Sequence, residues 1–361
     1  MRKHPNGATR RKFLSGLGIL ASSAALPGTS ALSQIATITG FRTKTYARGA
    51  KVPSGLRASM FRQNIAATTL EKGLEVNEIL RDALSQSYVP SRVPGGAVPS
   101  RFDWRDQNMV TPIRDQGFCG SCFIFGSLAA FESAYLIANK GSQPALDANN
   151  LEVSEQELLD CGISEADCVV GGWHDFVFTY LQLLGAVNEE SYRYNEYASQ
   201  RGVYCVSNWG SRIYFVRSWN YVSALDMIPS VQEIKSAIQS TGPVVCGVNA
   251  LARDVAPNKQ ASWDDYRGGV IDSVASNGKS EDVNHDVAII GWDDTLKGNG
   301  VSPGAWIVKN SWGTDWGAKG TVDAGYIFVP YNRNNIGFGA SWVKAWSAAS
   351  LKSIANVIEA K

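Results

Sequence analysis

One stretch decides the fold: RDQGFCGSCFIFGSLAAFESAYLIAN, residues 114–139. It sets Cys119 and Cys122 three positions apart in a glycine-rich turn, and the apolar residues and alanines after them have the three-to-four spacing of a helix. Two cysteines at this spacing form a redox pair, hold a metal ion, or divide into one structural and one reactive sulfur. The stretch alone leaves these three interpretations open.

The composition is that of a globular protein with a sizeable core. The chain has 361 residues, of which 44% are hydrophobic and 19% are charged, and its formal net charge is +1. This length fits one large domain or two smaller lobes. The near-neutral charge gives no electrostatic reason for binding nucleic acid, so we expect no nucleic-acid partner.

Residues 1–33 have the layout of an export signal. A basic head with Arg10 and Arg11 precedes the apolar stretch Phe13–Leu26, which is too short to span a bilayer comfortably, and small residues follow. The arginine pair resembles a bacterial twin-arginine signal, and an uncleaved membrane anchor is the alternative. We expect an exported protein, periplasmic or extracellular in a bacterium, with no membrane span in the mature chain.

Residues 34–97 are predicted to be a pro-segment or an N-terminal arm. Apolar residues at roughly helical spacing predict a helix over 58–86, and prolines then mark an extended linker. Whether this region inhibits the rest of the chain stays open at this point.

The order of the later elements predicts an α+β protein. Helices are predicted over 123–139, 154–160, 174–185 and 230–242, and Ser154 and Glu157 have the spacing of a capping box. Short β-branched and aromatic runs bounded by glycine predict strands over 242–250, 286–294, 304–313 and 324–330. Helices before strands indicate two lobes, one helical and one a barrel-like sheet, with a cleft between them.

Cys122 is the candidate nucleophile. At the start of a helix its sulfur would meet unpaired N–H groups and the positive end of the helix dipole, and both favour the thiolate. A thiolate also needs a proton acceptor, and His285 begins an apolar run from which its ring could project into a cleft. Asn310, on the next predicted strand, could fix the tautomer of that histidine.

Four segments carry a family resemblance. They are QGFCGSCF at 116–123, SEQELLDC at 154–161, NHDVAIIGW at 284–292 and KNSWGTDWG at 309–317. In this order they resemble the papain-like cysteine proteases over roughly residues 98–345. The resemblance implies a papain-like two-lobed fold, with a helical left lobe, a β-barrel-like right lobe and the active-site cleft between them.

The resemblance also implies the roles of the catalytic residues. Cys122 would be the nucleophile, His285 the general base and acid, and Asn310 the amide that orients the imidazole. Gln116 would donate its side-chain N–H to the oxyanion together with the backbone N–H of Cys122. Trp312 would shield the hydrogen bond between His285 and Asn310 from water.

The cysteine pattern fits export, because an oxidising compartment favours disulfides over metal sites. By the resemblance, Cys119 pairs with Cys168, and Cys161 pairs with Cys205. Cys246 remains as a buried free thiol. Neither a metal nor a cofactor is expected.

The resemblance places the substrate-binding residues on two walls. Gly171, Gly172, Trp173 and His174 would form one wall, and Asp286 would lie near the pocket for the second substrate side chain before the cut. A carboxylate there would favour Lys or Arg by charge pairing, and the alternative is that Asp286 points into solvent.

The function implied is a cysteine peptidase, with an endopeptidase favoured because no insertion blocks the cleft. We divide the chain into a signal (1–33), a pro-segment or arm (34–97), a peptidase domain (98–345) and a tail (346–361). Protein or peptide substrates and a monomer are expected. The alternatives are a thiol–disulfide oxidoreductase using Cys119 and Cys122, a catalytically silent relative, and an acyl-transferring relative.

Overall fold

The structure is a computed structural model. It describes residues 46–57, 59–60, 63, 98–142, 145–161, 167–197, 212–224, 226–250, 262–271, 279–297 and 303–352. The predicted export signal and most of the predicted helix over 58–86 lie outside the described residues. Among the described residues, no helix is both long enough and apolar enough to cross a membrane.

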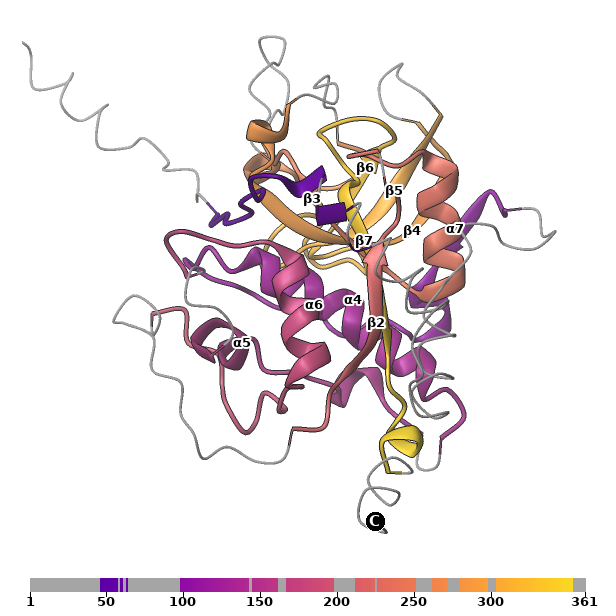
Figure 1. The fold of residues 1–361 in the computed structure, drawn as a ribbon. Coiled ribbons are helices and arrows are strands. Elements are labelled where there is room, and N and C mark those ends of the chain that lie inside the picture. The colour runs from indigo at the N-terminus through magenta and orange to yellow at the C-terminus, as the bar shows by residue number, and fades with distance from the viewer. Residues whose placement is uncertain are drawn as a thin grey trace, which may run out of the picture. The chain divides into compact units, whose positions relative to one another are not determined.

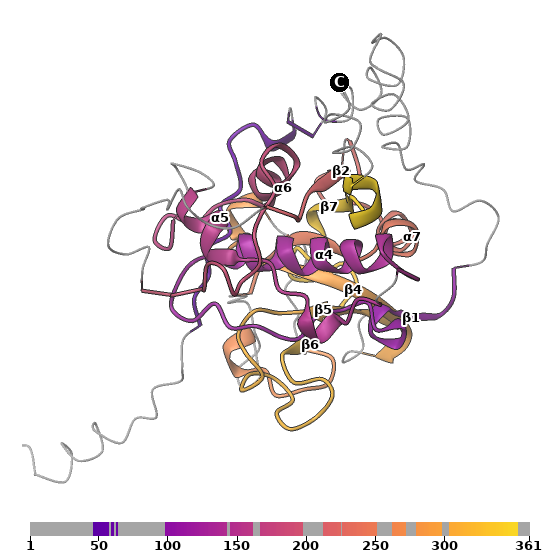
Figure 2. The ribbon, with the colours of Figure 1, turned by 90° about the horizontal axis from the view of Figure 1, so that it is seen from below.

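The predicted helices of the later chain are confirmed within a few residues. They are α4 (Cys122–Ala138), α5 (Glu155–Cys161), α6 (His174–Leu183) and α7 (Val231–Thr241). Helix α4 is buried on almost every side along its first four turns, which explains its unbroken run of apolar and small residues. Figure 2 shows it running through the centre, with α5 near its left end, α6 above it, and part of the sheet below it.

The N-terminal caps of α7 and α5 differ in how completely a capping box forms. Helix α7 begins with a full capping box between Ser230 and Glu233, and it ends at Gly242 with a φ of 117°. The box predicted for α5 is only half formed. Ser154 Oγ accepts the N–H of Glu157, but the Glu157 carboxylate accepts the N–H of Val187, 2.7 Å away. The glutamate therefore ties α5 to a neighbouring segment instead of closing its own cap.

The strands of the described residues form one antiparallel sheet. Its order is β2-β7-β3-β4-β5-β6, with β1 paired to β4. The strands are β1 (Arg101–Asp103), β2 (Val216–Tyr221), β3 (Val244–Val248), β4 (His285–Lys297), β5 (Pro303–Lys309), β6 (Tyr326–Pro330) and β7 (Phe338–Ala345). Short 3-10 helices complete the elements: η1 (Trp104–Gln107), η2 (Ala148–Asn150), η4 (Trp263–Asp265) and η5 (Ser280–Asp282).

The four predicted strands are all present, but β1, β2 and β7 were not predicted. Strand β7 reads FGASWVKA, in which small residues hide the alternation that marks a strand. Strand β2 reads VRSWNY, and its polar Ser218 and Asn220 are buried in pairing with β7. Both strands form because they pair with neighbouring strands, and their own residue patterns do not predict them.

Two main hydrophobic clusters organise the core, which agrees with the predicted α+β fold of two lobes. One cluster joins the helices, and its large members include Phe123, Phe131 and Phe178. The other fills the sheet side with aromatic residues, among them Trp263, Trp306 and Trp316. Figure 1 shows α4, α5 and α6 in one half and β3 to β6 with α7 in the other.

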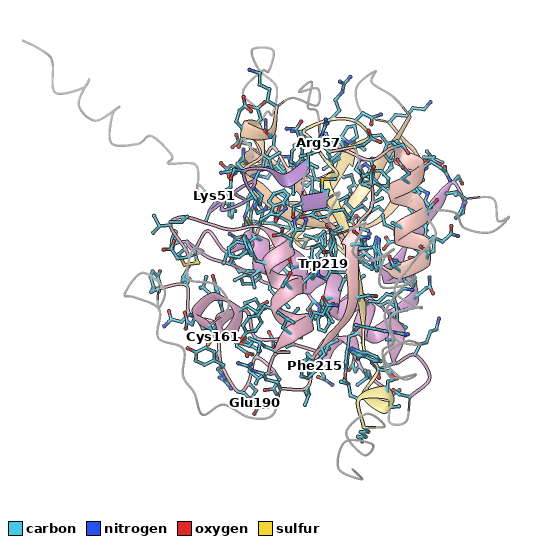
Figure 3. All side chains as sticks on the ribbon, viewed as in Figure 1. Lys51, Arg57, Cys161, Glu190, Phe215 and Trp219 are labelled. Atoms are coloured by element: carbon cyan, nitrogen blue, oxygen red, sulfur yellow. A yellow bond between two sulfur atoms is a disulfide. The ribbon has the colours of Figure 1, made fainter. Side chains whose placement is uncertain are left out.

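Residues 46–57 run between the elements of these two halves. Ala50 forms an isolated parallel bridge with Gly172, and Leu56 and Met60 are buried in the helical cluster. Lys51 and Arg57, labelled in Figure 3, mark the course of this part of the chain. We call residues 46–52 the covering segment, because they contact the residues described next.

Candidate active site

Cys122 opens helix α4, as the sequence predicts. Its side chain is fully buried, and Ser121 at the N-cap makes no side-chain cap hydrogen bond. The sulfur accepts two backbone N–H groups, from Gly49 at 3.2 Å and from Asp286 at 3.4 Å. One donor belongs to the covering segment and the other to the start of β4.

His285 is the first residue of β4, directly before the residue whose N–H reaches the sulfur. Its Nε2 lies 2.8 Å from Asn310 Oδ1, and the same oxygen accepts the N–H of Ser311. An amide oxygen only accepts hydrogen bonds, so the imidazole proton is on Nε2 and Nδ1 is a bare acceptor. Nδ1 has no hydrogen-bond partner among the described residues.

Tryptophan rings cover the histidine–asparagine hydrogen bond. The ring of Trp312 lies 4.7 Å from the His285 ring, and Trp263 meets the imidazole edge-on at 6.1 Å. Both tryptophans are fully buried. Trp312, to which the resemblance gives the shielding role, thus lies against the imidazole, whereas Trp263 was not predicted from the sequence.

Gln116 is fully buried in the loop before Cys122. Its Nε2 donates to the carbonyl oxygens of Cys119 at 2.8 Å and Ala47 at 3.3 Å. Its Oε1 accepts the hydroxyl of Ser311 at 2.6 Å. The amide is thus oriented by its neighbours so that an N–H faces a carbonyl oxygen of the covering segment.

Several residues of the covering segment form hydrogen bonds with residues of the site. Gly49 accepts the N–H of Gly172 at 2.8 Å, and Lys51 donates to the Gly172 carbonyl at 2.8 Å. At the other end, the Ala47 carbonyl also accepts the indole N–H of Trp312 at 3.1 Å. The segment therefore spans from the Gly172 wall, past the sulfur, to Trp312.

Burial under this segment changes the pKa values of the two reactive groups. Desolvation, with a smaller contribution from the Asp286 carboxylate, raises the pKa of the Cys122 thiol to about 12. Desolvation also lowers the pKa of His285 to about 3, against the hydrogen bond to Asn310, which raises it. In the covered state both groups are therefore neutral at neutral pH.

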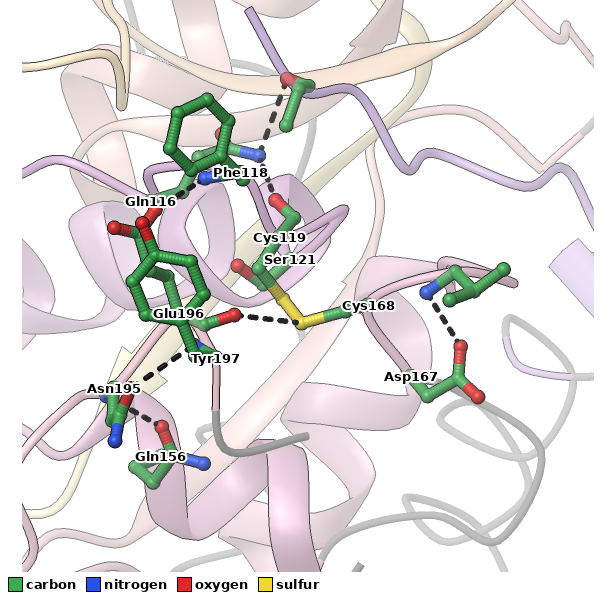
Figure 4. The surroundings of a disulfide bond; sticks show 12 residues. Gln116, Phe118, Cys119, Ser121, Gln156, Asp167, Cys168, Asn195, Glu196 and Tyr197 are labelled. Carbon is green, nitrogen blue, oxygen red and sulfur yellow. Dashed lines mark hydrogen bonds between the residues drawn. A yellow bond between two sulfur atoms is a disulfide. The ribbon is translucent and has the colours of Figure 1, made fainter. Parts of the chain in front are cut away.

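The bonding of the sulfur atoms shows which role each cysteine of the Cys119–Cys122 turn has. Cys119 is bonded to Cys168, and Cys122 is a free thiol. A Cys119–Cys122 redox pair is therefore wrong for this structure. Figure 4 shows the bridge beside Gln116 and Ser121, and the N–H of Gly120 also donates to the Cys168 carbonyl at 2.9 Å. The bridge holds the turn before the free thiol.

The remaining cysteines are described in part. Cys161 is also disulfide-bonded, but Cys205 lies outside the described residues, so the Cys161–Cys205 pairing stays a prediction. Cys246 is a buried free thiol on β3, as expected, and burial raises its pKa. Among the described residues no three His, Cys, Asp or Glu side chains gather into a group that could hold a metal ion.

The predicted wall residues lie together, at the start of α6. Gly171 has a φ of 74°, and a Cβ at Gly172 would lie 2.7 Å from the Phe123 ring, so both positions favour glycine. Trp173 and His174 are fully buried. The Gly171–His174 stretch thus packs against both the covering segment and the core.

Asp286 does not point into solvent, so that alternative is wrong. Its side chain is fully buried, and its Oδ2 lies 3.2 Å from His174 Nδ1. His174 Nε2 in turn lies 3.0 Å from the Gly339 carbonyl oxygen and 3.1 Å from Ser341 Oγ. This cross-connection was not predicted, because Gly339 and Ser341 belong to the unpredicted strand β7.

A cysteine, a histidine and an asparagine at one buried site define a class of thiol enzyme, and the sequence comparisons give the family. The profile of the papain family cysteine proteases matches residues 98–340. The chain belongs to this family.

The relatives agree with this assignment. The chain is similar to human cathepsin O, with 34% identity over 251 residues, covering 69% of this chain and 66% of that protein. It is also similar to the viral cathepsin of Heliothis zea nuclear polyhedrosis virus, with 33% identity over 272 residues, covering 72% of this chain and 63% of that protein. The matched part thus spans just under two thirds of these relatives.

A solved structure shares the fold. It is described as the structural basis for the limited antibody cross reactivity between the mite allergens Blo t 1 and Der p 1. The TM-score is 0.53 at 25% identity, covering 87% of this chain and 89% of that chain. The papain-like α+β fold expected from the sequence is confirmed.

Proposed function

We propose that this chain is a cysteine peptidase that hydrolyses peptide bonds through a thioester on Cys122. The observation that carries the proposal is the 2.8 Å contact between His285 Nε2 and Asn310 Oδ1, made where β4 meets the sulfur of Cys122. It leaves Nδ1 as the acceptor that a thiol proton needs. Family membership supports the same chemistry.

The proposed first half-reaction forms the thioester. The Cys122 thiol proton moves to His285 Nδ1, and the sulfur attacks the carbonyl carbon of the peptide bond. The oxyanion accepts hydrogen bonds from Gln116 Nε2 and from the backbone N–H of Cys122. The C–N bond then breaks, and the imidazolium gives its proton to the leaving amine.

In the second half-reaction His285 acts as a base toward water. The water oxygen attacks the thioester carbon, its proton goes to Nδ1, and the C–S bond breaks to release the carboxylic acid and the thiol. Asn310 keeps the proton on Nε2 throughout, so that Nδ1 faces the reaction. An amine in place of water would give acyl transfer, which remains the second candidate.

The contact between Gln116 and the covering segment supports the proposed oxyanion site. The Gln116 amide already donates to a carbonyl oxygen, that of Ala47, at 3.3 Å. The indole N–H of Trp312 donates to the same oxygen at 3.1 Å. A group of donors that holds one carbonyl oxygen is suited to hold another that gains charge.

We further propose that residues 34–97 form a pro-segment and that the covering segment inhibits the enzyme. The inhibition rests on the backbone hydrogen bonds of Gly49 and Lys51 to Gly172 and on the N–H of Gly49 at the sulfur. A chain starting near Val98 should be more active than one starting at Gln34. Equal activity of the two chains would reject autoinhibition.

The remaining assignments are proposals that rest on the sequence. Residues 1–33 would direct export, giving a periplasmic or extracellular enzyme in a bacterium, although the relatives named above are human and viral. The peptidase domain would be 98–345 and the tail 346–361. The enzyme would be a monomeric endopeptidase acting on proteins or peptides, without nucleic acid.

A preference for Lys or Arg as the second substrate residue before the cut is proposed for Asp286. One carboxylate oxygen faces His174, and Oδ1 has no hydrogen-bond partner among the described residues. A basic side chain that reached this buried oxygen would supply the partner it lacks. A peptide library should show the basic preference in the wild type and lose it in Asp286→Ala. A Leu or Phe preference that is the same in both would reject it.

The test of the proposed activity is covalent labelling with a peptidyl epoxide. The wild-type chain should gain one adduct on residue 122, and Cys122→Ala should gain none. A screen of fluorogenic peptides then measures hydrolysis. Labelling at another residue, or hydrolysis that persists in Cys122→Ala, would refute the assignment of the nucleophile.

A further inference from the structure

One side chain of the covering segment enters a polar site beside the reactive residues. Arg48 donates from Nη2 to Asp264 Oδ1 at 2.8 Å and to the Ala250 carbonyl oxygen at 3.4 Å. Its guanidinium lies 5.1 Å from the centre of the Trp312 ring. The Arg48 and Asp264 side chains are only 8% and 13% exposed, so the ion pair is largely removed from water.

The carboxylate that receives Arg48 is held by its own part of the chain. Asp264 lies on the 3-10 helix η4, where Ser262 donates to Asp264 Oδ2 at 3.2 Å and accepts the Asp264 N–H. The neighbouring Trp263 is fully buried and packs against the Trp312 and Trp316 rings. The acceptor is therefore fixed by contacts that do not depend on Arg48, as a preformed site requires.

The chemistry of this site is specific for a guanidinium. It offers a carboxylate oxygen and a backbone carbonyl, which both accept from Nη2, and an aromatic face beside the planar guanidinium. An ammonium group would use the same acceptors but has no planar face to lie against the Trp312 ring. A neutral side chain would leave the Asp264 carboxylate without its ionic partner.

The site lies on the side of the leaving amine. The covering segment crosses the sulfur at Gly49, and from there Ala50 and Lys51 run along Gly172. By the family resemblance, Gly172 belongs to one of the two substrate-binding walls, and Asp286 lies near the pocket for the second residue before the cut. Arg48 lies on the opposite side of the sulfur, against Trp312, whose ring packs on His285. That imidazole protonates the leaving amine in the proposed mechanism.

We propose that Asp264, the Ala250 carbonyl and the Trp312 face form a guanidinium-binding subsite for the first or second residue after the cut. It selects arginine in peptide substrates, and the covering segment uses it through Arg48. The inference rests on the proposed peptidase function, but binding at the subsite is measurable without catalysis.

The first experiment measures binding alone. The full-length chain carries Gly49→Ala, which removes the covering segment from the sulfur, together with Arg48→Ala, which vacates the subsite. The probe is a synthetic peptide with the sequence of residues 46–52, YARGAKV. Protection of Cys122 from a thiol alkylating reagent reports its affinity. A second peptide carries citrulline, which has the shape of arginine without the charge. We expect the arginine peptide to bind about 10- to 100-fold more tightly, as charge-assisted hydrogen bonds give.

Variants of the subsite assign the effect. In the Arg48→Ala, Gly49→Ala background, Asp264→Asn should bring the arginine-to-citrulline affinity ratio close to one. Asp265→Asn, the adjacent carboxylate on the same 3-10 helix, is the matched control and should keep the ratio. A ratio near one with Asp264 intact, or a ratio that Asp264→Asn leaves unchanged, would overturn the inference.

The second experiment measures selection during hydrolysis. Quenched fluorescent peptides carry arginine, lysine, citrulline or alanine at the first or second position after the cut. The ratio of kcat/KM for two peptides in one preparation is independent of the fraction of open molecules. We expect arginine to exceed citrulline about tenfold or more at one of the two positions, and this excess to vanish in Asp264→Asn.

The two experiments separate the failure of each proposal. Charge-dependent protection without hydrolysis of any peptide, even by a chain starting near Val98, would support the guanidinium subsite and refute the peptidase. Hydrolysis with equal rates for arginine and citrulline at both positions would support the peptidase and overturn substrate selection by Asp264.

Discussion

Replacing Gly49 by alanine is the sharpest test of what the covering segment does. A Cβ at Gly49 would overlap the carbonyl group of Gly120 and lie 2.7 Å from the Gly120 Cα. These are backbone atoms of the loop that leads to Cys122, and the next turn is held by the Cys119–Cys168 disulfide. Because the overlapping atoms are backbone atoms and a Cβ, no change of side-chain rotamer can relieve the overlap. The segment must therefore leave the sulfur in Gly49→Ala.

The size of the effect follows from the thiol pKa. In the covered state that pKa is raised from the ordinary 9.0 to about 12, chiefly by desolvation. At pH 7 the thiolate fraction is then about 10⁻⁵, against about 10⁻² for an unburied thiol. Since alkylation requires the thiolate, uncovering Cys122 should raise its alkylation rate about 1000-fold. Any ion pair formed with His285 would add to this factor.

The assay is alkylation of the full-length chain with iodoacetamide at pH 7, followed by mass spectrometry of the peptide containing Cys122. The buried thiol of Cys246 is an internal control, because it stays on β3 in both proteins. Ser54→Ala, an exposed change just beyond the covering segment, is the matched control and should behave as wild type. Faster labelling of Cys246 as well as Cys122 would indicate general unfolding.

The pH dependence has a defined sign. In the wild type the thiol stays protonated until the pH approaches about 12, so the alkylation rate should rise about tenfold per pH unit across the neutral range. In Gly49→Ala the rate should level off at a lower pH. A wild-type rate that already levels off near neutral pH, or equal rates in the two proteins, would refute the argument that the segment silences the thiol by burial.

Three further predictions concern the supports of the site. Asn310→Ala removes the acceptor at 2.8 Å from the imidazole, and kcat/KM should fall about 10- to 100-fold at an equal concentration of titrated thiol. Arg114→Ala leaves two buried glutamates without their ion-pair partner, and urea unfolding should show a loss of about 3–5 kcal/mol. The matched change Arg101→Ala, at a side chain 47% exposed, should cost less than about 1 kcal/mol. Replacing Cys119 and Cys168 by serine together opens a bridge across 49 residues of sequence separation and should cost about 4 kcal/mol in the same assay.

Each of these has an outcome that contradicts it. Unchanged kcat/KM in Asn310→Ala would mean that the amide does not set the imidazole tautomer. Equal losses for Arg114→Ala and Arg101→Ala would mean that burial of the ion pairs is irrelevant to stability. Unfolding of the double serine variant at the wild-type urea concentration would mean that the bridge does not constrain the unfolded chain.

The sequence was sufficient where a residue's role is set by its local context. Cys122 follows a glycine-rich turn and opens an apolar helix, and both features are visible in consecutive residues. Strand β4 is likewise recognisable from its own apolar run, and His285 is its first residue. Helix α7 carries its start and stop signals in Ser230 and Gly242. Local signals of this kind do not depend on distant contacts.

The sequence was insufficient where the partner lies far along the chain. The buried Asp286 carboxylate is paired with the His174 ring, which lies more than a hundred positions away in the sequence. No local pattern of charge or hydropathy indicates that contact. Glu157 has the spacing of a capping box, yet its carboxylate accepts a hydrogen bond from the backbone N–H of Val187. The covering segment has no periodicity that would place it, because its contacts are backbone hydrogen bonds to Gly172 and side chains meeting distant residues. Tertiary contacts override local propensity in all three cases.

The same contacts explain how a peptide can lie across a reactive thiol without being cut. Attack requires a carbonyl carbon at the sulfur, but the group that meets Cys122 Sγ is the N–H of Gly49, a hydrogen-bond donor. The Ala47 carbonyl oxygen is held by Gln116 and Trp312, and the Gly49 carbonyl oxygen accepts the N–H of Gly172. The segment thus satisfies the donors of the site and places an N–H, not a carbonyl group, in hydrogen-bond contact with the sulfur. Since burial under the same segment also keeps the thiol protonated, geometry and protonation both oppose cleavage as long as the segment lies across the sulfur.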